Sequence, residues 1–218
     1  MTPSSLLRLL TWLSPAFPTG AFAYSQGLEW AIENGDVKDE ASLTLWLEDL
    51  LHHGSLLSDV IILRCTRRSA PAAWPTIASE AASLALAHER RLETLAQGAA
   101  FRLAAAPWAC PALENWGDAP LPQPVALGVL AAHDAIDEDD LALGFLQAGI
   151  ANLVSASVRL VPLGQTAGLR VQAKLASAIL AVVQASRGLP LTACGGACFA
   201  TDIASMRHET QYTRLFRS

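Results

Sequence analysis

Helical periodicity broken by proline and glycine is the feature that most constrains the fold of this sequence. Apolar residues recur at three- and four-residue spacings over long segments, and alternating strand patterns are scarce. The most demanding segment, Leu141 to Val158, has eighteen residues without a charged side chain. A helix that is apolar on every side has to be covered by other helices or by lipid. We therefore expect an all-α protein, a multi-helix, bundle-like single domain over residues 1–218.

Turn residues divide the chain into the expected helices. Pro162-Leu-Gly164 predicts one of the breaks, and Gly98 is a candidate break inside a long helical segment. Residues 107–124 hold five prolines and are the best candidate for a linker, packed on the surface, that forms an internal boundary. The expected helices span residues 6–13, 21–34, 39–53, 55–68, 77–105 (one or two helices), 124–135, 137–161 and 165–186, followed by a tail at 201–218.

Charge and composition exclude some classes of protein. The net charge is −5 and no long basic run occurs, which argues against binding to nucleic acid. Hydrophobic residues make up 52% of the chain and charged residues 16%, enough to bury a large core and leave apolar surface for partner proteins. The beginning of the chain lacks a secretory signal, and four cysteines form no disulfide framework, so we expect a reducing, cytoplasmic location.

A membrane location is the alternative that the apolar segment 141–158 raises. Gln147, Asn152, Ser155 and Ser157 interrupt this segment, and no Lys/Arg asymmetry marks an inner face. The centre of a soluble bundle fits the same residues. We therefore expect no membrane-spanning helix.

Motifs for catalysis are missing from the sequence. It has no glycine-rich phosphate loop, no His-Glu-x-x-His motif and no Gly-x-Ser-x-Gly motif. Glu29 near Tyr24 and His133 beside Asp134 are the only candidates for acid–base chemistry, and both fit packing or surface positions better. We expect no enzyme, since no nucleophile can be paired with a base.

Cysteine and histidine offer one alternative function, a metal-binding or metal-sensing module. Cys194 and Cys198 lie four residues apart, but the glycines between them make a shared helical face doubtful, and two buried small residues are the simpler interpretation. His208 is the most plausible additional ligand. His52 and His53 suit the end of a helix. The segment Glu89-Arg-Arg91 with Glu93 predicts a solvated face with ion pairs.

The final eighteen residues combine apolar, aromatic and arginine side chains, the types that dominate protein–protein contacts. Thr201 or Asp202 is expected to cap a helix, which would place Tyr212, Leu215 and Phe216 on one face. Two interpretations remain open: a terminal helix folded back on its own core, or a tail that becomes ordered on another protein.

Two further motifs indicate more than packing. Ser14–Glu29 places two prolines, two glycines and three aromatic residues in a turn and helix start, where Tyr24 offers a hydroxyl group. Arg159–Gln172 places Gln165 and Arg170 at the start of a helix. Uncharged polar groups in so apolar a region need hydrogen-bond partners inside the chain or on another chain.

Taken together and in this order, these motifs resemble those of UreF-type urease accessory proteins. The matching segments are Ser14–Glu29, Glu89-Arg-Arg91 with Gln97-Gly98, Gln165–Arg170 with Gln172, and Met206–Ser218. The resemblance implies an all-helical homodimer with no catalysis and no cofactor or metal of its own. It also implies partners, namely the accessory protein UreD (also called UreH), the GTPase UreG and apo-urease, to which the assembly delivers nickel for insertion.

The resemblance carries roles over to individual positions. It implies that the tail docks on UreD/UreH, and that the two internal motifs take part in the assembled complex. The implied partner-binding residues are Tyr24, Glu29, Gln165, Arg170, Met206, Arg207, His208, Gln211, Tyr212, Arg214, Leu215 and Phe216.

Overall fold

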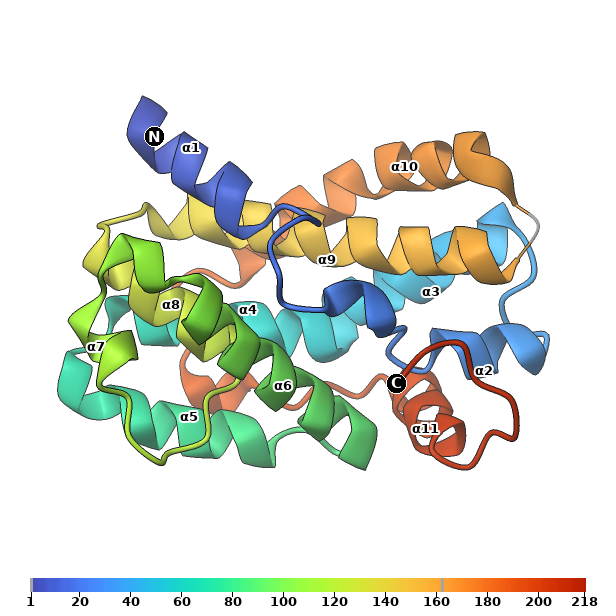
Figure 1. The fold of residues 1–218 in the computed structure, drawn as a ribbon. Coiled ribbons are helices and arrows are strands. Elements are labelled where there is room, and N and C mark those ends of the chain that lie inside the picture. Colours follow the sequence, from blue (N-terminus) through green and yellow to red (C-terminus); the bar gives the residue numbers. More distant parts are fainter. Residues whose placement is uncertain (1, 162) are drawn as a thin grey trace.

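The computed structural model describes residues 2–161 and 163–218, and every regular element within them is a helix. Figure 1 shows these helices packed together, with no strand in the described part of the chain. The expected all-α class is confirmed. The α-helices are α1 (Pro3–Trp12), α2 (Leu28–Glu33), α3 (Glu40–His53), α4 (Ser55–Arg68), α5 (Trp74–Ser83), α6 (His88–Ala104), α7 (Pro111–Glu114), α8 (Gln123–His133), α9 (Glu138–Leu160), α10 (Gly164–Ala185) and α11 (Phe199–His208).

Local sequence sets the starts of two long helices. The Asp39 carboxylate accepts a hydrogen bond from the Ser42 amide at 2.8 Å, and the Ser42 hydroxyl accepts one from the Asp39 amide at 3.1 Å. Asp137 accepts from the amides of Asp139 and Asp140 at the start of α9. These caps satisfy amides that have no partner within the helix. Both helices therefore begin where the sequence predicts.

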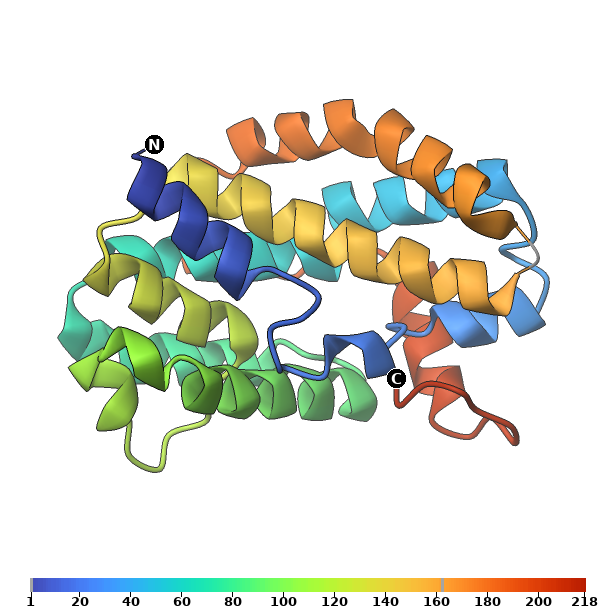
Figure 2. The same cartoon turned by 45° about the horizontal axis from the view of Figure 1, so that its top comes forward.

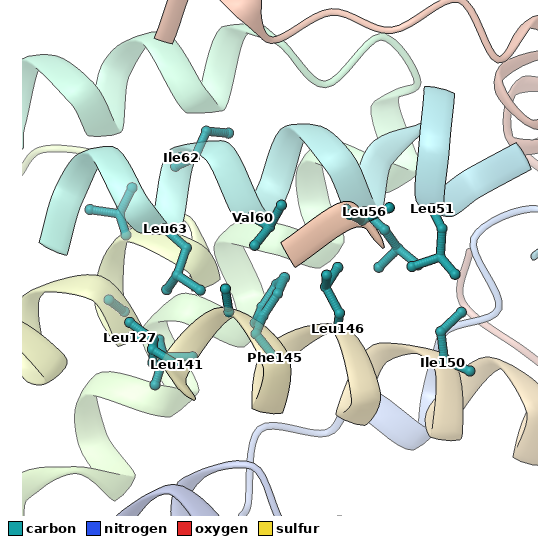
Figure 3. Packing of buried hydrophobic residues seen from close by; sticks show 14 of the residues in the cluster. Leu51, Leu56, Val60, Ile62, Leu63, Leu127, Leu141, Phe145, Leu146 and Ile150 are labelled. Atoms are coloured by element: carbon teal, nitrogen blue, oxygen red, sulfur yellow. The ribbon is translucent and has the colours of Figure 1, made fainter. Parts of the chain in front are cut away.

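The core lies between α4 and the helices around it. Figure 3 shows side chains of α4 pointing toward those of α9, and Val60, Leu63, Leu141 and Leu146 are completely buried there. α8 also packs against α4, and α10 packs on α9 and α3 as an outer layer (Figure 2). Burying each such side chain contributes roughly 1.5–3 kcal/mol before the entropy cost of ordering it.

A buried arginine ties three helices together. Arg64 on α4 is 1% exposed and donates to the Val183 carbonyl at 2.7 Å and to the Ser186 hydroxyl at 3.0 Å, both at the end of α10. It also lies 2.9 Å from the carboxylates of Glu138 and Asp139 at the start of α9. Because every guanidinium nitrogen has a partner, the buried charge is compensated.

The prediction of one helix over residues 21–34 is wrong. The chain forms a short 3-10 turn at Ala21–Ala23 (η1) and then a separate α2. Gln26 and Gly27 adopt φ of 55° and 77°, a left-handed backbone that a helix cannot contain. Gly27 also faces α11 so closely that a Cβ atom would lie 2.5 Å from the Ser205 amide nitrogen. A contact with a distant helix therefore breaks the expected one.

The break in the helical segment 77–105 lies between α5 and α6, at residues 84–87, and not at Gly98. Gly98 is in the middle of α6, where a Cβ atom would lie 1.8 Å from the Leu121 carbonyl oxygen. This glycine lets a loop approach the helix rather than ending it.

The proline-rich segment 107–124 contributes Cys110, Leu113, Trp116 and Leu121 to the same core cluster as the long helices. Its role as an internal boundary stays a prediction. Of the expected break near residue 163, Pro162 lies outside the described residues, and α10 begins at Gly164.

Two helices, α9 and α10, are long and apolar enough to cross a membrane by length and composition. In the most apolar window of each, 50% and 44% of the residues are buried inside the protein. Core helices of soluble proteins have the same properties, so these two helices are weak evidence for a membrane protein.

Candidate partner-binding surface

The expected tail, residues 201–218, divides into the end of α11 and a non-helical segment, residues 209–218, which we call the tail from here on. This segment returns to the body of its own chain. Figure 1 places it beside α2 and α11, with the C-terminal end close to α2. α11 ends at His208, so the expected helical face of Tyr212, Leu215 and Phe216 is wrong. The expected cap is also wrong: α11 begins at Phe199, before Thr201 and Asp202.

Glu29 on α2 sets the path of the tail. Its carboxylate accepts hydrogen bonds from the backbone amides of Leu215 at 2.7 Å and Phe216 at 2.9 Å. The same side chain lies 3.1 Å from Nε2 of His208. Because these amides bond a carboxylate rather than carbonyls in their own segment, this part of the tail is not helical.

His208 is 0% exposed and lies between two carboxylates. Its Nδ1 is 2.6 Å from Oε2 of Glu89 on α6, and its Nε2 faces Glu29. Arg214 of the tail donates to the other oxygen of Glu89 at 2.5 Å. We name Glu29, Glu89 and His208 the buried triad.

The expectation that the start of α6 is a solvated face is wrong for its acidic residues. Glu89 is buried and Glu93 is 2% exposed. Glu93 accepts from the side-chain amides of Gln26 and Gln97 and from the hydroxyl of Ser218. These carboxylates are buried because segments far away in the sequence supply their donors, which a local charge pattern cannot reveal.

Main-chain contacts fasten the end of the tail to the segment before α2. The Ser25 amide and hydroxyl both donate to the Ser218 main-chain oxygen at 2.6 Å. The Arg217 amide donates to the Ala23 carbonyl at 2.8 Å. The tail therefore pairs with the Ser14–Glu29 motif through backbone groups.

Phe216 is the apolar anchor of the tail. It is 5% exposed, and the Arg159 guanidinium on α9 lies 4.5 Å from the centre of its ring. Arg159 also donates to the Phe22 carbonyl at 3.0 Å. One arginine thus connects α9, the Ser14–Glu29 motif and the tail.

Apolar side chains on α11 and the tail face the solvent. Tyr212 is completely exposed and Leu215 is 75% exposed, although their neighbour Phe216 is buried. On α11 the exposed residues follow at spacings of four and three, which places them on one helical face. We name this set the α11–tail surface: Phe199, Ile203, Met206, Tyr212 and Leu215.

The remaining residues predicted to bind a partner lie in three places: on α11 and the tail, in the segment before α2, and on α10. Arg207 is exposed on α11, and Gln211 is half-buried and donates to Glu33 at 2.5 Å. Tyr24 is buried, with 7% of its surface exposed. Gln165 and Arg170 are exposed on α10, a different helix from those that form the buried triad. Arg170 pairs there with Glu40 of α3 at 2.8 Å.

A family model described as UreF matches residues 37–176. The chain belongs to the UreF family. Relatives named "Urease accessory protein UreF" come from Methylobacterium sp. strain 4-46, 46% identical over 97% of this chain and 88% of the relative, and from Rhodopseudomonas palustris strain BisB5, 47% identical over 99% and 92%. Another, from Bradyrhizobium diazoefficiens, is 44% identical over 99% of this chain and 92% of its own. These likenesses span the segments that form the buried triad as well as the UreF-model region.

In this UreF-family chain, the three residues of the metal-module alternative do not form a ligand set. The described residues hold no group of three or more His, Cys, Asp or Glu that could bind a metal ion. Cys194 lies 3.6 Å from the Ser58 carbonyl, and burial raises the pKa of its thiol to about 12. Cys198 is buried before α11, and the carboxylates of the triad occupy both nitrogens of His208.

Sequence reasoning missed four residues that build the site: Ser25, Gln26, Glu89 and Glu93. Each lies in or beside a motif that carried the family resemblance, and that was the available signal. Glu89 and Glu93 were misinterpreted because charged residues on helices usually face water.

Proposed function

We propose that this chain is a non-catalytic adaptor in urease maturation. It links the accessory protein UreD/UreH to the GTPase UreG, so that nickel reaches apo-urease and is inserted. The name that its relatives carry, urease accessory protein UreF, supports the general role. The observation that carries the specific role is the α11–tail surface, where Tyr212 and Leu215 are exposed beside buried polar anchors.

The α11–tail surface suits docking for an energetic reason. Ordering a flexible segment during binding costs roughly 0.5–1.5 kcal/mol for each immobilised side chain. Here Glu29, Ser25 and Phe216 hold the tail backbone in place before any partner arrives. The exposed tyrosine and leucine, with Arg207 nearby on α11, are then presented at a lower entropy cost.

The predicted partner-binding residues then act in two ways. Met206, Arg207, Tyr212 and Leu215 are exposed and meet the partner directly. The buried residues hold those side chains in position. This second group is Tyr24, Glu29, His208 and Phe216, with the half-buried Gln211 and the exposed Arg214 at its edge.

A second contact is proposed on α10. Gln165 and Arg170 lie on its exposed face, away from the buried triad, so one partner can bind there while another binds the tail. We also propose that the chain is a cytoplasmic homodimer without a cofactor of its own. Simultaneous binding of two partners is what an adaptor requires.

The test is purification of UreD/UreH with this chain from cells that produce both. Tyr212→Ala/Leu215→Ala removes two exposed side chains from the tail, and we expect at least a roughly ten-fold weaker complex. Leu7→Ala/Leu103→Ala is the matched control, because it removes two exposed leucines, on α1 and α6, that lie outside both proposed contacts. Wild-type recovery of the partner by the tail variant would contradict the proposal.

The link to UreG needs its own measurement. UreG is added to the purified pair, and its recovery is compared between the wild-type chain and Arg170→Ala, which changes an exposed α10 side chain. We expect less UreG with the variant and unchanged UreD/UreH. Recovery of UreG at wild-type yield would remove Arg170 from the proposed contact.

A further inference from the structure

We infer that Glu29, Glu89 and His208 are positioning residues that share one extra bound proton, and that this proton holds the tail in its docking conformation. The inference rests on the proposed function in one respect: the seated tail is the surface that a partner recognises. Three features of the described residues carry it: the proton count of the triad, the charges around it and the attachment of the tail to both carboxylates.

The proton count follows from the two short contacts of His208. Nδ1 lies 2.6 Å from Glu89 and Nε2 lies 3.1 Å from Glu29, and the imidazole is completely buried. An ionised carboxylate only accepts, and a neutral imidazole carries a single N–H. Two hydrogen bonds need two hydrogens, so the triad holds one proton more than a neutral histidine with two carboxylates.

The balance of charge around His208 favours that extra proton, although one cation opposes it. On α6, Arg90 is already engaged by Asp59 of α4 and lies 3.6 Å from Glu93. Among the residues that the structure describes, the cation paired with the triad is Arg214 of the tail, at Glu89. Carboxylates therefore outnumber the cations next to His208. Two nearby carboxylates have partners elsewhere: Glu33 accepts from Gln211, and Glu209 accepts from the backbone amide of His88. Arg207, the residue before His208, is exposed to solvent.

Loss of the extra proton acts directly on the tail. One ring nitrogen would then direct its lone pair at a carboxylate oxygen in a buried site, which is repulsive. Either Glu29 or Glu89 has to turn away. Glu29 holds the Leu215 and Phe216 amides, and Glu89 holds Arg214, so both movements loosen the tail.

Linkage gives the direction of the effect. If proton loss releases the tail, seating of the tail favours proton binding, and the seated fraction falls as the pH rises. For release of one proton, the equilibrium changes by at most about ten-fold per pH unit.

The experiment measures hydrogen exchange of the Leu215 and Phe216 amides in the complete chain without a partner, from about pH 6 to 9, the range in which histidine loses its charge. Protection factors are corrected for the intrinsic pH dependence of exchange. In the wild-type chain we expect protection of both amides to fall with rising pH, while core amides of α4 stay constant. Constant protection in the tail across this range would overturn the inference.

Glu89→Gln gives a result that a purely structural role would not. The side-chain amide introduced there can donate to Nδ1 and accept from Arg214, so a neutral His208 then satisfies both contacts. We expect a tail that stays protected and a pH profile that becomes flat. His52→Gln changes an exposed histidine on α3 and is expected to keep the wild-type profile.

Two outcomes separate this inference from the proposed function. If protection of the tail amides in Glu89→Gln depends on pH as steeply as in the wild type, the inference of a shared proton is refuted, whatever the chain binds. If that variant is misfolded by circular dichroism, the wild-type profile and His208→Gln, which cannot titrate, decide the question. Failure of UreD/UreH to bind a chain with the expected profile would instead refute the docking role.

Discussion

Leu215 and Phe216 are adjacent, and the structure predicts opposite consequences when each is shortened to alanine. Phe216 is 5% exposed and packs under Arg159, whereas Leu215 is 75% exposed. Removing a buried phenylalanine typically costs about 3–5 kcal/mol, and the cation–π contact adds about 0.5–2 kcal/mol. Because about 1.4 kcal/mol is a factor of ten, Phe216→Ala should reduce the equilibrium constant for seating of the tail at least about 100-fold.

Leu215→Ala should leave seating almost unchanged, within about 0.5 kcal/mol, because the Glu29 contact uses its backbone amide. It should weaken binding of UreD/UreH by about 1–2 kcal/mol, or roughly 5–30-fold in Kd. Hydrogen exchange of the tail reports seating, and calorimetric titration with UreD/UreH reports docking. Equal loss of protection in the two variants would refute the separation between the buried and the exposed side of the tail.

Three further predictions concern other parts of the fold. Gly27→Ala should destabilise the chain by more than the roughly 1–2 kcal/mol that a left-handed alanine costs, because its Cβ would lie 2.5 Å from the backbone of α11. Gly35→Ala is the control, since Gly35 also has a positive φ but faces open space. The difference between the two variants in urea unfolding measures the cost of the clash. Arg64→Met should cost about 3 kcal/mol in urea unfolding, since it removes a 1% exposed charge from its partners; no measurable loss would contradict its role. Burial raises the pKa of Cys194 to about 12, so iodoacetamide should label this thiol slowly in the folded chain at about pH 8, as followed by mass spectrometry. Rapid labelling would contradict this. The contribution of the protonated thiol to stability should be lost as the pH rises from about 8.5 toward 12.

Local signals in the sequence were sufficient for most helix boundaries. The caps at Asp39 and Asp137 act within one turn, and the end of α3 at Gly54 depends on the local backbone. These interactions join residues that are neighbours in sequence, so a periodic pattern and a stop signal are enough to predict them.

Contacts between distant segments produced the errors. The helix expected over residues 21–34 breaks because Gly27 must fit against α11. The tail is not helical after His208 because Glu29 takes the amides of Leu215 and Phe216. A helix propensity contains no term for an acceptor that lies almost the whole chain away.

The sequence by itself determined the all-helical class and, through the order of its motifs, the likeness to UreF proteins. It did not determine which side of each motif faces inward. Glu89 looked like a surface charge, and only the fold brings it to His208, 119 residues away, at 2.6 Å. The physical reason is that the free energy of a buried charge depends on the partners that surround it, and those partners are assembled only when the chain has folded.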